Sequence, residues 1–213
     1  MYIIGMTTGR CGSKSFAAFM NQQKKTTFTH ERAMDVTFFP MFNPYTRAMK
    51  TLRGYGGKYK GDISPGWSLW ASEILQNHPE ACKIVWLHRD VKEVTESFIK
   101  QKEHRLQQWK TNFNGPDGFL GAYPVWEKEW SHEAVGRAVR KVFYWCKGIN
   151  TLYNETERYV FPIHMMELDN EDKQLELLTW LGYKRSEIRL GMPHLNRWYE
   201  VEDSTVTRKD VSR

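Results

Sequence analysis

Short apolar runs alternate along the chain with segments whose apolar residues recur at helical spacing. The runs at 2–4, 84–87 and 159–165 have the length and composition of strands, and the β-prone segment 26–30 is predicted as a further strand. The segments with helical spacing are predicted as helices, and they lie at 16–20, 47–53, 67–76, 91–98, 133–153 and 171–181. Strands that alternate with helices favour a parallel sheet with helices on both faces. We therefore predict a three-layer α/β domain with a mostly parallel central sheet.

Three other stretches are read from composition rather than from periodicity. Four glycines within 54–61 predict a flexible loop. Residues 101–131 surround a turn cluster at 114–118 and hold many aromatic residues: Trp109, Phe113, Phe119, Tyr123, Trp126 and Trp130. Aromatic faces suit ring-shaped substrates, so this stretch is predicted as a lid over a substrate, with simple packing onto the domain as an equal alternative. The single domain is expected to span 1–200, and the charged residues 201–213 to form a mobile tail.

Composition narrows the classes of protein that fit. A chain of 213 residues suits one domain, and a net charge of +6 suits an anionic ligand or an acidic surface. The basic residues are scattered, which argues against nucleic acid. Cys11, Cys82 and Cys146 are expected to be reduced thiols, and neither metal-ligand spacing nor a run of about 20 apolar residues is present. With a predicted strand at the very start and no signal peptide before it, the expected location is cytoplasmic.

The segment 7–15 joins the first predicted strand to the first predicted helix and is rich in Gly, Ser and Thr. A strand, a glycine loop and a helix in this order aim free backbone N–H groups and the positive end of the helix dipole at an anion. Gly12 allows close approach, and Ser13 or Ser15 can cap the helix or donate a hydroxyl. The sequence therefore predicts a phosphate- or sulfate-binding loop, with an ordinary strand-to-helix turn as the alternative.

This loop departs from the nucleotide-binding pattern G-x-x-x-x-G-K-[ST]. Ser13 stands between Gly12 and Lys14, and the position five before Gly12 is Thr7. In that pattern the Lys reaches the outer phosphates of a nucleoside triphosphate and the Ser or Thr holds magnesium. Here the better-placed cation is Arg10, which argues against the site of a kinase that uses ATP and magnesium.

A second candidate anion site follows the apolar run 84–87. Arg89 lies where that strand ends, and Ser97 lies about two turns into the helix that follows. The planar guanidinium of Arg grips phosphate oxygens with two hydrogen bonds, and a Ser hydroxyl can add a third donor. The alternative is a structural ion pair at Arg89 and a surface position at Ser97.

Ionisable residues also follow the strand predicted at 26–30. His30, Glu31 and Arg32 stand where this strand ends, and the carboxyl ends of parallel strands line the ligand crevice of open α/β sheets. Glu31 is therefore a candidate general base beside the anion loop, with His30 as its rival. A solvated charged turn is the alternative interpretation.

Both anion motifs resemble those of sulfotransferases that use 3′-phosphoadenosine 5′-phosphosulfate (PAPS). Residues 7–15 read T-x-G-R-x-G-S-x-S, which resembles the 5′-phosphosulfate loop of that family. Residues 89–97 resemble its 3′-phosphate motif, Arg-Asp/Asn-Pro-x-x-x-x-x-Ser, with Val91 in place of Pro. Many members also carry a Lys-Ser/Thr-Pro element, whose Lys is replaced here by Ile63, so no catalytic role is carried over to that position.

The resemblance implies a P-loop NTPase-like fold and metal-independent transfer of a sulfuryl group from PAPS to a hydroxyl or amine of a small-molecule or glycan acceptor. Residues 101–131 would then be the acceptor-binding lid. It implies catalytic roles for Arg10 and for Glu31 or His30. The donor-binding residues that it implies are Arg10, Cys11, Gly12, Ser13, Lys14, Ser15, Arg89, Ser97, Asn196 and Arg197. A small-molecule or nucleoside kinase and a non-catalytic nucleotide- or polyanion-binding domain remain the alternatives, and neither the acceptor nor the oligomeric state follows from the sequence.

Overall fold

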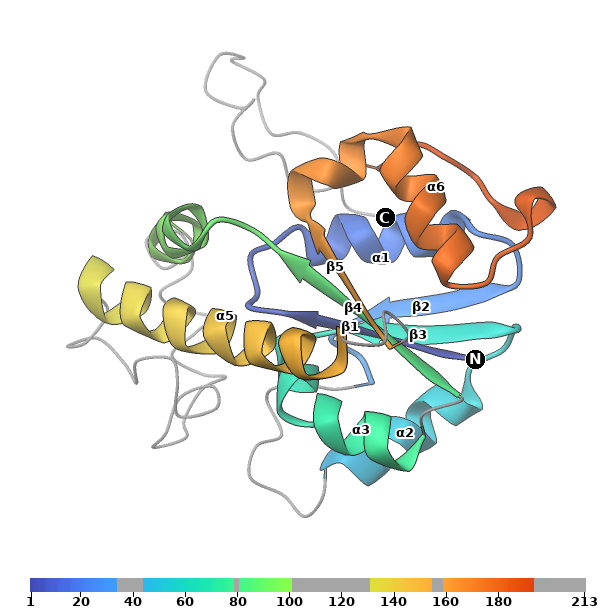
Figure 1. The fold of residues 1–213 in the computed structure, drawn as a ribbon, viewed down its shortest axis with the longest axis horizontal. Helices are drawn as coiled ribbons and strands as arrows, with labels where there is room; N and C mark the ends of the chain where they lie inside the picture. Colours follow the sequence, from blue (N-terminus) through green and yellow to red (C-terminus); the bar gives the residue numbers. More distant parts are fainter. Residues whose placement is uncertain (34–43, 79–80, 101–130, 155–158, 194–213) are drawn as a thin grey trace, which may run out of the picture.

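The structure is a computed structural model of the chain, and it describes residues 1–33, 44–78, 81–100, 131–154 and 159–193. Five strands form one sheet: β1 (Tyr2–Thr7), β2 (Thr26–His30), β3 (Tyr59–Ile63), β4 (Cys82–His88) and β5 (Val160–His164). Their order is β2-β3-β1-β4-β5, and every neighbouring pair is parallel. The carboxyl ends of all five strands therefore lie along one edge of the sheet (Figure 1).

Helices cover both faces of this sheet. They are α1 (Ser13–Gln22), α2 (Pro44–Gly54), α3 (Ala71–Asn77), the helix over 91–100, α5 (His132–Asn154) and α6 (Glu171–Trp180). Three short 3-10 helices are η2 (Pro65–Leu69), η4 (Met165–Asp169) and η5 (Arg185–Glu187). Figure 1 shows α1 and α6 on one face and α2, α3 and α5 on the other, which confirms the predicted three-layer α/β architecture.

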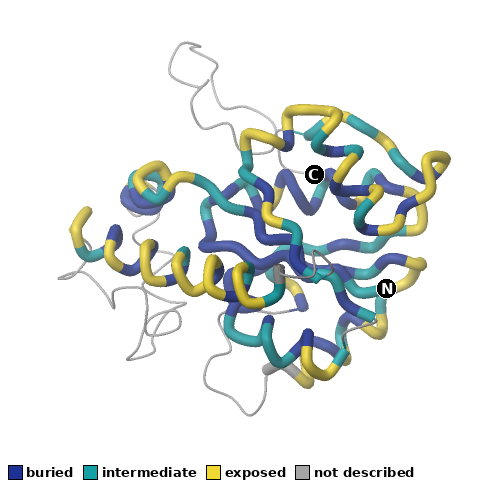
Figure 2. Tube along the Cα trace, in the orientation of Figure 1, coloured by how far each residue is buried: buried dark blue, intermediate teal, exposed yellow. Residues whose placement is uncertain are grey.

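The core lies between these layers. Ile3, Ile4 and Met6 of β1 are fully buried, as are Ile84 and its apolar neighbours in β4. Strands covered on both faces read as continuous apolar runs, which explains why 2–4 and 84–87 are visible in the sequence. Figure 2 shows the buried strands at the centre and the exposed outer sides of the helices around them. The three cysteines are buried and free, as expected.

The prediction of a flexible loop over 54–61 is wrong for its last part. Residues 59–63 form β3, which pairs with β1 and β2 and so completes one half of the sheet. Gly61 is required by packing rather than by flexibility. A Cβ at this position would lie 2.3 Å from the carbonyl oxygen of Ile3 and 2.4 Å from the ring of Phe28. The glycine therefore marks a close approach between strands.

Most other elements match their predictions; one predicted helix is divided, and some predictions concern residues that the structure does not describe. The strand at 26–30 and the helices over 133–153 and 171–181 are present to within one or two residues. The helix predicted over 67–76 is divided into η2 and α3. The lid apart from Ser131, the tail, Asn196 and Arg197 lie outside the residues that the structure describes. Within the described ranges, no helix is both long enough and apolar enough to cross a membrane.

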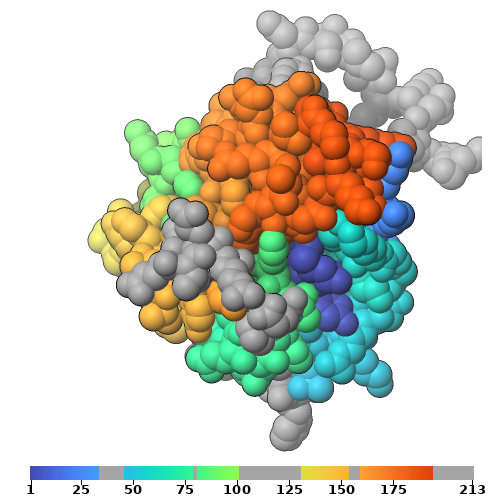
Figure 3. Space-filling view, turned by 45° about the vertical axis from the view of Figure 1, so that its right-hand side comes forward, coloured from blue at the N-terminus to red at the C-terminus, as the bar shows by residue number. Residues whose placement is uncertain are grey.

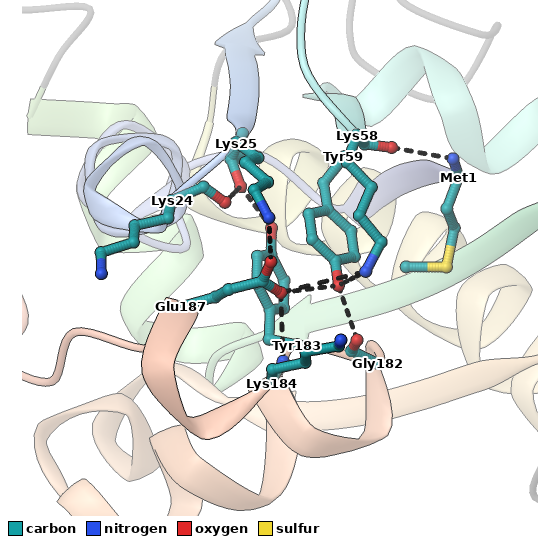
Figure 4. Close-up of polar contacts among 10 residues, drawn as sticks. Met1, Lys24, Lys25, Lys58, Tyr59, Gly182, Tyr183, Lys184 and Glu187 are labelled. Carbon is teal, nitrogen blue, oxygen red and sulfur yellow. Dashed lines mark hydrogen bonds and ion pairs between the residues drawn. The ribbon is translucent and has the colours of Figure 1, made fainter.

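A buried carboxylate ties η5 to the amino ends of β2 and β3. Glu187 has a side chain 5% exposed; Lys25 Nζ lies 2.8 Å from its Oε1, and Lys58 Nζ lies 3.9 Å from its Oε2. The hydroxyl of Tyr59 donates to the same carboxylate and to the carbonyl of Gly182 (Figure 4). The hydrogen bond from Lys25 is the largest cause that lowers the pKa of Glu187 to about 2. Figure 3 shows the orange and red C-terminal residues lying against blue N-terminal ones.

Candidate functional site

The loop between β1 and α1 has the backbone of an anion site. Gly9, Arg10 and Gly12 have φ values of 80°, 56° and 75°, so three of four consecutive residues are left-handed. Gly12 is the N-cap of α1, and no side chain caps the first turn. The sequence predicts that Ser13 or Ser15 either caps the helix or offers a hydroxyl; Gly12 holds the N-cap position, and Ser13 Oγ instead lies 2.9 Å from His30 Nε2. Without a capping side chain, the N–H groups of the first turn face outward, where an anion can accept hydrogen bonds.

Packing fixes the loop from several sides. The Cys11 thiol is fully buried, lies 3.0 Å from Thr8 Oγ1 and donates to the carbonyl of Gly9 at 3.2 Å. Because this thiol is buried in the core, its pKa is raised and it stays protonated at neutral pH. A Cβ on Gly12 would lie 3.0 Å from Met165 Sδ, which places the end of β5 against the loop. Cys11 thus offers a ligand its backbone rather than its side chain.

The two anion motifs meet in space. Arg10 Nε donates to Ser97 Oγ at 3.1 Å, which joins the loop after β1 to the helix after β4. Arg89 directly follows β4 with a side chain 18% exposed, and it forms an ion pair with Glu93 in the first turn of the helix over 91–100. Because β1 and β4 are neighbouring strands, their carboxyl ends hold the two predicted cation sites side by side.

The end of β2 reaches the same loop. His30 Nε2 lies 2.9 Å from Ser13 Oγ, and Glu31 Oε1 lies 3.8 Å from the same nitrogen. Burial lowers the pKa of His30 to about 4, helped by the charges of Lys14 and Arg10, so the imidazole is neutral at neutral pH. Glu31 has a φ of 53°, and its N–H donates to the carbonyl of Ile63 at 3.0 Å. Both candidate bases therefore lie beside the anion loop.

Two further groups at this edge are not identified by the sequence patterns. His88 and His164 are in register on β4 and β5, and their ring centroids lie 5.3 Å apart. Burial, followed by the charge of His164, lowers the pKa of His88. Asp62 is a fully buried carboxylate in β3, a strand that the glycine-rich sequence conceals. In the sequence, Asp62 stands out only as an acidic residue directly before Ile63, Ser64 and Pro65.

The charged groups at the carboxyl edge define what the candidate site can bind. No group of three or more His, Cys, Asp or Glu residues in the described part of the chain is arranged to hold a metal ion. Cationic side chains at the carboxyl edge include Arg10, Lys14 and Arg89. This arrangement can bind an anionic group at the N-terminus of α1. It also places a carboxylate, Glu31, and a neutral imidazole, His30, next to the bound group.

Comparisons with known proteins agree with this geometry at the level of the fold. No family model matches the sequence, and no protein of curated function matches it. A solved structure described as the crystal structure of a sulfotransferase from Alicyclobacillus acidocaldarius superimposes with a TM-score of 0.58. It shares 14% sequence identity, and the alignment covers 85% of this chain and 81% of that chain. The chain therefore has a P-loop-like α/β fold of the kind found in a sulfotransferase.

Proposed function

We propose that this protein is a sulfotransferase that moves a sulfuryl group from PAPS to a hydroxyl or amine of an acceptor. The observation that carries the proposal is the hydrogen bond from Arg10 to Ser97. It connects two motifs that are 87 residues apart and that resemble the two ends of one donor site. The fold shared with a sulfotransferase supports this interpretation at low sequence identity.

In this proposal the donor lies along the carboxyl edge of β1 and β4. The backbone N–H groups of residues 11–15 bind the 5′-phosphosulfate, because they sit at the uncapped start of α1. Arg89 and Ser97 bind the 3′-phosphate, and Glu93 holds the guanidinium of Arg89 near the start of its helix. Asn196 and Arg197, outside the described residues, stay predicted contacts of the nucleotide.

The chemistry proposed at the loop is a single displacement at sulfur. The acceptor oxygen or nitrogen forms a bond to sulfur, while the bond between sulfur and the bridging oxygen of the 5′-phosphate breaks. Arg10 and Lys14 neutralise the negative charge that builds up on the leaving phosphate. Glu31 removes the proton of the acceptor, with His30 as the rival base. Both side chains lie near Ser13, so neither is excluded by position.

Calorimetric titration tests the donor. 3′-Phosphoadenosine 5′-phosphate should bind much more tightly than 5′-AMP, because only the first carries a phosphate for Arg89 and Ser97. Addition of magnesium should leave both affinities unchanged. Tight binding of ATP that requires magnesium would instead favour the kinase alternative, and equal affinity for the two adenosine phosphates would rule out the PAPS site. Transfer of labelled sulfate from PAPS to a panel of phenols, alcohols, amines and glycans would then identify the acceptor.

A further inference from the structure

A buried carboxylate lies beneath the candidate base. Asp62 Oδ1 accepts a hydrogen bond from Thr29 Oγ1 at 2.5 Å and another from the backbone N–H of Arg32 at 3.1 Å. Its other oxygen, Oδ2, accepts from Trp67 Nε1 at 2.9 Å. Asp62 itself has no exposed surface. The carboxylate thus joins two segments, the turn at 29–32 and the short helix that holds Trp67.

Two of these hydrogen bonds enclose the turn that carries the candidate bases. Thr29 comes directly before His30, and Arg32 comes directly after Glu31, so one carboxylate oxygen holds both ends of the turn. The turn needs such support because Glu31 has a φ of 53°, a left-handed conformation that is unfavourable for a residue with a Cβ. The geometry makes Asp62 the anchor of this strained turn.

The third hydrogen bond reaches toward the anion loop. Trp67 belongs to η2, whose first residue, Pro65, packs against Gly9. A Cβ on Gly9 would lie 3.4 Å from Pro65 Cγ. Asp62 therefore links the turn after β2 to the short helix that supports the loop after β1. A neutral residue could fill the space of Asp62 without the free-energy cost of burying a charge. The charge therefore indicates a role beyond packing.

The charge acts on His30. The charged groups that act on this imidazole are Lys14 of α1, Arg10 of the loop and Asp62 of β3, and Glu31 Oε1 of the turn lies 3.8 Å from its Nε2. The charge of Asp62 raises the pKa of His30, whereas burial and the two cations lower it. Asp62 is thus the buried negative charge that opposes the two cations.

We propose that Asp62 is a positioning residue, which holds the turn of His30 and Glu31 against the anion loop and balances the positive charge around His30. The inference rests on the proposed function, because it assigns Asp62 a part in the same reaction. It adds a residue that touches neither donor nor acceptor and that acts through the hydrogen bonds of Thr29, Arg32 and Trp67.

The test is Asp62→Asn, a change that keeps the shape of the side chain and removes its charge. Two quantities are measured: the pKa of His30 by NMR titration, assigned with His30→Gln, and the steady-state kinetics of sulfuryl transfer. We expect the pKa of His30 to fall below its wild-type value. We expect kcat to fall by about 10- to 100-fold, since a small misplacement of reacting groups is costly, while 3′-phosphoadenosine 5′-phosphate still binds within a few-fold of wild type.

The matched control is Glu187→Gln, which neutralises another buried, hydrogen-bonded carboxylate, this one at the opposite end of the sheet. It should lower stability while leaving the pKa of His30 and kcat as in wild type. If Asp62→Asn leaves both quantities unchanged, or if the control shifts them equally, the inference is wrong. The titration of His30 needs no substrate, so it decides on Asp62 even if no sulfuryl transfer is found, an outcome that would count against the proposed function alone.

A second variant separates position from charge and serves if Asp62→Asn does not fold. Thr29→Val removes one hydrogen bond to Asp62 and keeps the carboxylate. We expect it to lower kcat without lowering the pKa of His30. Wild-type kcat in a folded Thr29→Val protein would contradict the positioning role.

Discussion

Arg10 Nε donates a hydrogen bond to Ser97 Oγ at 3.1 Å, across the carboxyl edge of β1 and β4. The cation proposed to act on the leaving phosphate is therefore held by the hydroxyl proposed to bind the 3′-phosphate. A guanidinium has five N–H donors, and the hydrogen bond from Nε to Ser97 uses one of them. Binding at one end of the donor and charge stabilisation at the other are connected through this one contact.

Removal of the Ser97 hydroxyl should affect both ends of the donor. Ser97→Ala deletes the acceptor for Arg10 and one donor for the 3′-phosphate. One hydrogen bond contributes about 0.5–1.5 kcal/mol net, so affinity for 3′-phosphoadenosine 5′-phosphate should fall by roughly two- to tenfold. Because Arg10 also loses its anchor, kcat should fall as well. Ser97→Thr is the control, since it keeps the hydroxyl and should retain most of the affinity and most of kcat. A loss of affinity with kcat unchanged would show that the contact does not position Arg10.

The two arginines should give opposite kinetic profiles. Arg89 is proposed to grip a phosphate that does not react, so Arg89→Ala should weaken binding of 3′-phosphoadenosine 5′-phosphate at least about tenfold and leave 5′-AMP binding unchanged. Arg10 is proposed to lie where charge develops on the leaving phosphate, so Arg10→Ala should lower kcat more than affinity. Arg89→Lys serves as a control that keeps the charge and loses the planar fork. Identical profiles for both alanine variants would contradict this division of roles.

The sequence predicts the elements whose burial leaves a periodic trace. β1 and β4 read as apolar runs because helices cover both faces, and α5 reads as an amphipathic helix because one side packs on the sheet. β3 leaves no such trace. Gly61 is required because it packs between Ile3 and Phe28. In the local composition of the sequence, however, a glycine is typical of a loop.

The candidate site follows the same division. Arg10 and Ser97 are identifiable because a loop between strand and helix and an Arg-to-Ser spacing are local patterns. Their contact depends on β1 lying next to β4, which no local pattern contains. Asp62 is harder to identify, because its partners Thr29 and Trp67 come from different segments and the strand that carries it is concealed. The sequence shows which residues could bind an anion or act as a base, and the strand order determines which of them lie close together.

The Glu187 cluster predicts an acid-sensitive part of the stability. The pKa of Glu187 is lowered to about 2 in the folded protein, below its unfolded value of about 4.3, so its contribution is present above pH 4.3 and is lost as pH falls through 2. Glu187→Gln should therefore lower the midpoint of urea unfolding at pH 7. The difference from wild type should narrow as the pH is lowered below about 4. Lys184→Ala, which keeps the backbone N–H that Glu187 accepts from, is the control and should unfold like wild type. A difference that is constant with pH would contradict the ionic role of this carboxylate.

The identity of the base is the prediction with the most direct alternatives. His30 Nε2 lies 2.9 Å from Ser13 Oγ, and Glu31 Oε1 lies 3.8 Å from the same nitrogen. A general base contributes about 10²–10⁴-fold, so Glu31→Gln should reduce kcat by that order while binding of 3′-phosphoadenosine 5′-phosphate stays nearly unchanged. His30→Ala should reduce kcat less, through the loss of its contact with Ser13.

The dependence of kcat on pH gives an independent test of which residue is the base. The pKa of His30 is about 4, so a rate that depends on neutral His30 would fall as pH drops through 4, and that acidic limb would persist in Glu31→Gln. If Glu31 is the base, the acidic limb of the pH profile should be absent in Glu31→Gln, because this variant lacks the carboxylate. A protein in which His30→Ala abolishes transfer and Glu31→Gln keeps both its rate and its acidic limb would have His30 as its base.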